Sequence, residues 1–131
     1  MRKFRVTKED SYDLGFVDAC QLSAAISSEE FTQWVYWVIE HSDQDLPTYF
    51  FDLTSLGSGA GALYDAVGFV PSPELSGSED SAIDGIAYKR GAYDPYPDYD
   101  VHISRKDALR ALADNPQIEQ RFRDTFPFIQ Y

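Results

Sequence analysis

The sequence has no positive side chain through most of its length, because neither Lys nor Arg occurs at positions 9–88. That stretch contains 15 Asp and Glu residues, and the whole chain of 131 residues has a formal net charge of −11. Its carboxylates cannot pair with Lys or Arg inside the stretch, so they must be solvated, cap helices, pair with the chain ends or bind something basic. Nucleic acid and anionic membranes are therefore unfavourable partners across most of the surface.

Cysteine and long apolar runs are also scarce. Cys20 is the only cysteine, which excludes an internal disulfide and fits a reducing cytoplasm. We expect it on an apolar helix face, as a small core residue. No apolar run approaches the roughly 20 residues of a membrane span. The basic residues 1–5 are not followed by the apolar segment of a signal peptide, so we expect a cytoplasmic protein.

Apolar residues are plentiful, at 44% of the chain, and aromatic residues make up 15%. A chain of this length is expected to be a single domain, residues 1–131. Folding of such a chain hides roughly two-thirds of its unfolded surface, which is enough for one core without disulfides or metal. We find no internal repeat and no linker that would divide it.

The clearest secondary-structure signal predicts a helix at residues 29–41. Ser28 can cap it, and Glu29 and Glu30 fall in the first turn, where the helix dipole favours anions. Apolar residues then follow at helical spacing: Phe31, Trp34, Val35 and Val38. That spacing is typical of one buried face, so we expect this helix at the centre of the core.

Caps and breakers predict further short helices. They are expected at residues 12–26, from Asp45-Leu46-Pro47 to Gly57, at residues 62–67 up to Gly68, from the Ser76/Glu79 capping box to Gly91, from the Ser104/Asp107 box through Leu112, and from Asn115-Pro116 to the residue before Pro127. Short helices without a convincing run of strands predict an all-α or nearly all-α compact bundle. Whether residues 1–8 and 99–103 pair as a minor two-stranded element stays open.

Catalytic and metal-binding patterns are weak. The glycines at 57, 59 and 61 lack the Lys and Ser/Thr of a phosphate loop and indicate a joint between helices. His41 and His102 lack metal-site spacing, and Asp98-Tyr99-Asp100 lacks the Gly and Glu of a calcium loop. We therefore expect no enzyme, cofactor or metal. Clustered carboxylates leave open an alternative, a small enzyme or a metal- or ligand-binding domain.

Residues 92–101 predict an irregular loop in which tyrosines recur every three residues with aspartates between them. Tyrosine rings give a large contact area at low entropic cost, and aspartates can meet Arg or Lys. We interpret the loop as a binding surface, and rings pinned onto the core remain an equal alternative. The candidate partner-binding residues are Tyr93, Asp94, Tyr96, Asp98, Tyr99 and Asp100, together with Asp43, Asp80 and Asp84.

Three segments carry a resemblance to a known class of proteins: Glu-Glu-Phe-Thr-Gln-Trp at 29–34, Asp-Leu-Pro-Thr-Tyr-Phe-Phe-Asp-Leu at 45–53 and Asp-Gly-Ile-Ala-Tyr-Lys-Arg-Gly at 84–91. They resemble bacterial immunity proteins, the cytosolic antidotes encoded beside contact-dependent or polymorphic toxins. The resemblance implies a protein that binds and neutralises a basic toxin, such as a nuclease, by stoichiometric and electrostatic inhibition. Adaptation of a whole proteome to high salt is the remaining explanation of the acidity.

Overall fold

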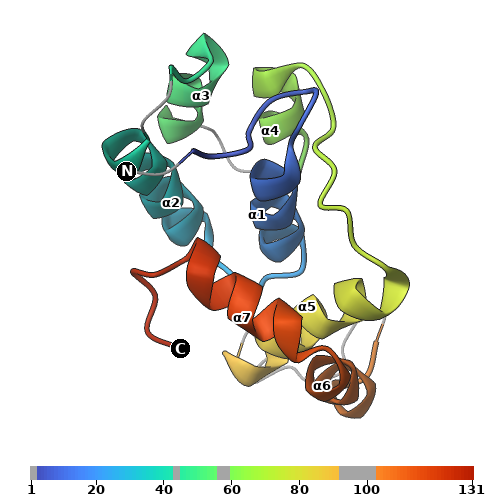
Figure 1. Cartoon of the computed structure of the whole chain (residues 1–131). Coiled ribbons are helices and arrows are strands. Elements are labelled where there is room, and N and C mark those ends of the chain that lie inside the picture. The colour runs from blue at the N-terminus through green and yellow to red at the C-terminus, as the bar shows by residue number, and fades with distance from the viewer. Residues whose placement is uncertain (1–2, 43–44, 56–59, 92–102) are drawn as a thin grey trace. The chain divides into compact units, whose positions relative to one another are not determined.

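The computed structural model describes residues 3–42, 45–55, 60–91 and 103–131 (Figure 1). Within these ranges the elements are α1 (Tyr12–Leu22), α2 (Ser28–His41), α3 (Thr48–Asp52), the 3₁₀ turn η1 (Leu53–Ser55), α4 (Ala60–Val67), α5 (Gly77–Lys89), α6 (Arg105–Asp114) and α7 (Pro116–Thr125). The described residues contain no β-strand, and the all-α prediction is confirmed. Residues 3–8 are irregular, and residues 99–102 of the other candidate strand lie outside the described ranges.

Several predicted helix boundaries need correction. The first helix ends at Leu22 and not at residue 26, and Ala24 just beyond it has a φ of 62°. Ser27, not Ser28, caps α2: its hydroxyl accepts from the Glu30 amide at 3.1 Å, and the Glu30 carboxylate accepts from the Ser27 amide at 2.9 Å. This reciprocal box needs an acidic residue three positions after the cap. A cap at Ser28 would put Phe31 there.

The third predicted helix is shorter and tighter than expected. Its α-helical part stops at Asp52 and continues as η1, while Leu56 and Gly57 lie outside the described residues. The next helix starts at Ala60, two residues before the predicted start, and ends at Gly68 as predicted, where φ is 80°. A positive φ favours glycine, so the position of that end is set by the residue type.

Contacts within the chain gather into two compact units. The first unit contains Met1–Asp18 and Ser27–Glu74, and the second contains Ala19–Ile26 and Leu75–Tyr131. Helix α1 contributes residues to both. The single-domain expectation stays a prediction, and each unit is described by itself.

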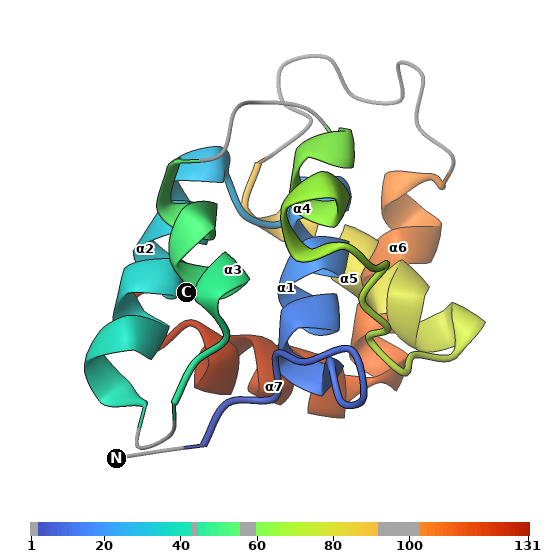
Figure 2. The same ribbon diagram turned by 90° about the horizontal axis from the view of Figure 1, so that it is seen from above.

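The core of the first unit is built around α2. All four apolar residues predicted for its inner face are buried, which confirms that prediction. The Trp34 ring meets the Phe50 ring of α3 edge-on, with centroids 5.8 Å apart, and α3 lies beside α2 in both views (Figures 1 and 2). Burying one such side chain contributes about 1.5–3 kcal/mol.

Gly15 of α1 has a packing role in the first unit. A Cβ at this position would collide with the backbone of Ser72, so the helix can lie against the segment before α5 only because the residue is glycine. The Ser72 amide also donates to the Ser11 hydroxyl at 2.9 Å. The sequence pattern alone makes Gly15 a weak point in a helix, whereas in the fold it permits close approach.

The second unit is formed largely by α5, α6 and α7. Gly85 of α5 lies against α6, where a Cβ would meet the Ala108 carbonyl oxygen at 2.5 Å. The Ser76/Glu79 capping box is present, and the Ser104 hydroxyl accepts from the Asp107 amide at 3.2 Å. The side chain of Asn115 makes no capping hydrogen bond to α7; its Nδ2 donates to the Ala111 carbonyl at 2.8 Å, and Pro116 opens α7. Cys20 is buried as predicted.

Candidate partner-binding surface

The excess negative charge is concentrated in the first unit. Its residues include 12 Asp and Glu against four Lys and Arg, a net charge of −8. The second unit has ten acidic and seven basic residues, a net charge of −3. Together these account for the −11 of the whole chain. Any long-range attraction of a basic partner therefore originates mainly from the first unit.

Some carboxylates of the first unit have internal roles. The Arg5 guanidinium donates to Asp10 at 2.7 Å, which lowers the pKa of Asp10. The Arg5 backbone amide donates to Asp13 at 2.8 Å, and Glu30 completes the cap of α2. These groups stabilise the N-terminal turn and a helix start, so they are not available to a partner without cost.

Asp18 is a buried carboxylate of α1, with only 6% of its surface exposed. The Tyr64 hydroxyl of α4 donates to it at 2.9 Å. Burial raises the pKa of Asp18, and the bond from Tyr64 opposes that shift without cancelling it. This residue belongs to the packing of the first unit.

Seven acidic residues of the first unit remain exposed and, within the described part of the chain, make no ion pair: Glu9, Glu29, Glu40, Asp45, Asp52, Asp65 and Glu74. These residues face solvent on the surface of the first unit. All seven belong to the stretch at positions 9–88, which contains no Lys or Arg.

The outer side of α2 combines this charge with an aromatic ring. Glu29, Gln33, Tyr36 and Glu40 follow the spacing i, i+4, i+7, i+11, which places them on one helix face, and all four are exposed. Tyr36 is 54% exposed, whereas Trp34 on the inner side is 1% exposed. We call these four residues the α2 acidic face. The spacing of this face is present in the sequence, but the apolar face of the same helix gives the stronger signal.

The structure describes two of the nine predicted partner-binding residues. Asp80 is exposed in the first turn of α5. Asp84 is 1% exposed, so its carboxylate cannot be part of a binding surface, and that prediction is corrected. Helix α5 buries every residue from 82 to 88 because it packs against both α6 and α7. Outside the described residues lie Asp43, Tyr93, Asp94, Tyr96, Asp98, Tyr99 and Asp100.

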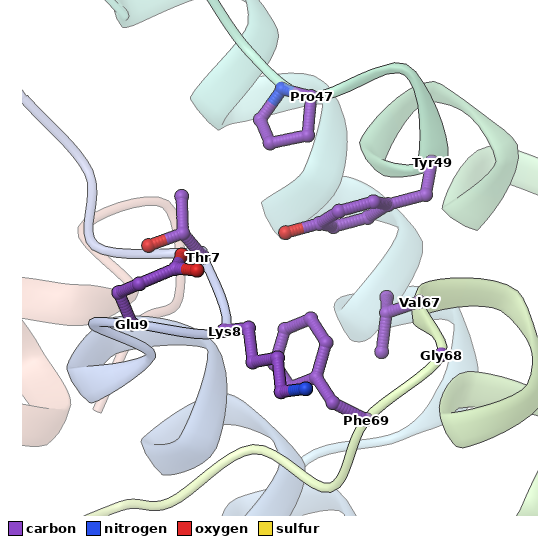
Figure 3. A pocket seen from close by; sticks show the side chains of 8 residues that line it. All are labelled: Thr7, Lys8, Glu9, Pro47, Tyr49, Val67, Gly68 and Phe69. Atoms are coloured by element: carbon purple, nitrogen blue, oxygen red, sulfur yellow. The ribbon is translucent and has the colours of Figure 1, made fainter.

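A hollow of about 320 Å³ opens on the first unit (Figure 3). Its lining residues come from three segments: Thr7, Lys8 and Glu9; Pro47 and Tyr49; and Val67, Gly68 and Phe69. The Tyr49 hydroxyl donates to the Val6 carbonyl at 2.7 Å, and the Tyr49 and Phe69 rings meet edge-on at 5.9 Å. Burial raises the pKa of Tyr49, and the negative charge of Glu9 adds to that effect.

A second hollow, of about 410 Å³, lies on the second unit and has a different character. Lys89, Arg90, Gln130 and Tyr131 line it. Lys89 pairs with Glu119 at 2.9 Å, and the Tyr131 hydroxyl donates to the same carboxylate at 2.6 Å. These bonds lower the pKa of Glu119. The charged groups of this hollow are engaged within the unit.

The positions of the side chains and the lengths of the helices decide whether the described residues could hold a metal ion or span a membrane. Among the described residues, no three His, Cys, Asp or Glu side chains come together in a way that could hold a metal ion, and none of the helices there is long and apolar enough to cross a membrane. The His41 ring stacks on Trp37 with centroids 3.7 Å apart, and burial raises the pKa of Cys20. Both side chains therefore belong to packing.

Comparisons with protein-family models, with curated proteins and with solved structures find no match for this chain.

Proposed function

We propose that this protein is a stoichiometric binding protein that captures a basic partner protein through the first unit, and that it acts as an immunity protein against a toxin, most simply a nuclease. The observation that carries the proposal is the set of seven exposed carboxylates without an ion pair in the described part of the chain. A nuclease presents Lys and Arg to substrate phosphates. An acidic protein can occupy the same surface by charge complementarity.

The α2 acidic face supports the proposal because it offers more than charge. Binding surfaces gain most of their affinity from a few large side chains, and tyrosine is among the commonest. Tyr36 is such a side chain, half-exposed between Glu29 and Glu40 on a helix that the core holds firmly. A ring flanked by carboxylates suits an arginine-rich surface, since guanidinium groups both stack on rings and pair with carboxylates.

The alternative function, a small enzyme that uses clustered carboxylates, predicts an acid of raised pKa inside a hollow. Asp18 has a raised pKa, but it lines neither of the two hollows described above, which are formed by described residues, and its carboxylate accepts a hydrogen bond from the Tyr64 hydroxyl. We therefore favour the binding function.

The test is to mix the protein with the purified product of the adjacent gene and to measure complex formation by calorimetry and light scattering. We expect a one-to-one complex and loss of the partner's toxic activity at one equivalent. Glu40→Gln should weaken the complex, whereas Asp114→Asn, which removes one exposed charge from α6 of the second unit, should weaken it less. Absence of a complex at micromolar concentrations, or equal effects of the two variants, contradicts the proposal.

A further inference from the structure

The hollow of the first unit combines apolar walls with hydrogen-bond acceptors (Figure 3). Its walls include the rings of Tyr49 and Phe69 and the aliphatic side chains of Pro47 and Val67. Such walls favour an occupant with an apolar stem or a flat face. The two rings meet edge-on, and both line the hollow and are partly exposed, so an occupant can contact them.

The polar groups of the hollow mostly accept hydrogen bonds. The Tyr49 hydroxyl already donates its proton to Val6, so its oxygen can only accept from an occupant. The Thr7 hydroxyl is bonded to the backbone of Asp10, and the Glu9 carboxylate accepts only. Among the described lining side chains, Lys8 is therefore the one donor not already used. An occupant that brings its own donors matches this set.

Charge selects between a cationic and an anionic occupant. The first unit has a net charge of −8, and the field of Glu9 reaches into the hollow, where it acts on Tyr49. Two aromatic rings also attract a cation through their negative faces. Lys8 opposes a cation, but its side chain is exposed and can turn toward solvent. The balance favours a positively charged group.

We propose that this hollow receives one arginine side chain of the basic partner protein, with its guanidinium against the Tyr49 and Phe69 rings and its N–H groups directed to Glu9 and the Tyr49 oxygen. The inference rests on the proposed function and adds a specific contact to it. Arginine fits better than lysine because its planar, weakly hydrated cation stacks on rings and presents five donors. The volume, about 320 Å³, is near the lower limit of small-ligand pockets, roughly 300 Å³, and suits one side chain.

The experiment uses the isolated protein and a small probe, N-acetyl-argininamide. Amide resonances are followed by ¹H–¹⁵N NMR during titration, with N-acetyl-citrullinamide as the uncharged probe of the same shape and hydrocinnamate as the anionic one. We expect the arginine probe to produce saturable shifts at Tyr49, Gly68 and Phe69. The citrulline probe should bind about two- to fivefold more weakly than the arginine probe. This factor corresponds to the loss of one exposed cation–π contact.

Two neighbouring substitutions give opposite expectations, which makes the test independent of simple damage to the fold. Glu9→Gln should weaken binding of the arginine probe by about two- to fivefold. Lys8→Gln should strengthen it by a similar factor, because it removes the like charge. Phe69→Leu should weaken it while keeping an apolar wall, and thermal unfolding of each variant shows whether the fold is intact.

Tighter binding of hydrocinnamate, equal binding of the two amide probes, absence of saturable shifts, or weaker binding by Lys8→Gln overturns the inference. The outcome is separable from that of the proposed function because no partner is present in the titration. If a complex with the partner forms but the arginine probe does not bind, only the inference of an arginine site is contradicted. If the arginine probe binds but no complex with a partner forms, the arginine site is supported and the proposed function is contradicted.

Discussion

At the scale of single residues, the buried carboxylate of Asp18 has the clearest consequence for stability. Only 6% of the residue is exposed, and the Tyr64 hydroxyl donates to it at 2.9 Å. Removing a carboxylate from water disfavours its charged form, and this is why the pKa of Asp18 is raised. A group whose folded pKa is raised stabilises the fold when protonated and loses that contribution as it ionises.

We therefore predict that Asp18→Asn stabilises the protein at neutral pH. The amide keeps an oxygen that accepts from Tyr64 and carries no charge to bury. The wild-type carboxyl contributes fully to the free energy of unfolding when the pH is below its ordinary pKa of 3.8. This contribution disappears as the pH rises through the higher pKa of the folded state. The difference in free energy of unfolding between Asp18→Asn and the wild type should thus grow from pH 3.5 to pH 7. Urea unfolding at both pH values measures it, and a variant less stable than wild type at pH 7 would count against this account.

Residue identity predicted some burial and missed the rest. Cys20 and the apolar face of α2 could be assigned from spacing and hydrophobicity, because both follow from local pattern. Asp84 could not, because burial of an acidic residue depends on which helices pack against α5, and spacing along the chain does not specify that. Only the fold reveals that α5 is covered over its whole central part.

At the scale of elements, the start of α2 depends on one hydroxyl. Ser27 and Glu30 exchange bonds between side chain and backbone, while the neighbouring Ser28 lies inside the helix. Capping hydroxyls satisfy amides that have no partner within the helix. The two adjacent serines therefore differ in role, although the sequence presents them alike.

We predict that Ser27→Ala lowers the free energy of unfolding by about 1 kcal/mol, the usual cost of losing a cap. Ser28→Ala is the matched control and should change it by less than about 0.5 kcal/mol, since Ser28 contributes its backbone carbonyl to Thr32 and not its hydroxyl. Urea unfolding of both variants gives the comparison. Equal losses would show that the cap is assigned to the wrong residue.

Most helices could be predicted from caps, glycines and prolines, which act within a few residues of where they stand. The ends of α1 and α3 could not be predicted well. The chain leaves α1 at Leu22, and α3 tightens into η1 so that Leu53 is buried. Ala25 and Ile26, just beyond the end of α1, are buried as well, and tertiary packing of this kind can outweigh a residue's preference for one backbone conformation. Gly15 shows the same effect, because the absence of a side chain at this position allows α1 to pack against the backbone of Ser72.

At the scale of the whole molecule, the main feature is the uneven distribution of charge. The first unit has a net charge of −8 and the second of −3. In the second unit, Lys89 and Arg123 lie near Glu119, whereas seven exposed acids of the first unit make no ion pair within the described residues. Adaptation to high salt predicts a diffuse excess of acids. The concentration of these unpaired acidic residues in the first unit therefore favours a binding surface over adaptation to high salt.

A charged surface of this kind acts on the rate of encounter more than on the final contacts. Unsteered protein pairs associate at about 10⁵–10⁶ M⁻¹s⁻¹, and complementary charge can raise this by orders of magnitude at low salt. Screening removes the effect, because the Debye length falls from about 10 Å at 0.1 M to about 3 Å at 1 M. A toxin antidote benefits directly from fast capture.

The most direct test of the proposed electrostatic capture is the association rate of the protein with the purified product of the adjacent gene, measured by stopped flow at ionic strengths from about 0.05 M to about 0.5 M. We predict that the association rate constant falls by about tenfold or more over this range, with a much smaller change in the dissociation rate constant. An association rate constant that does not vary with salt would contradict electrostatic capture by the first unit.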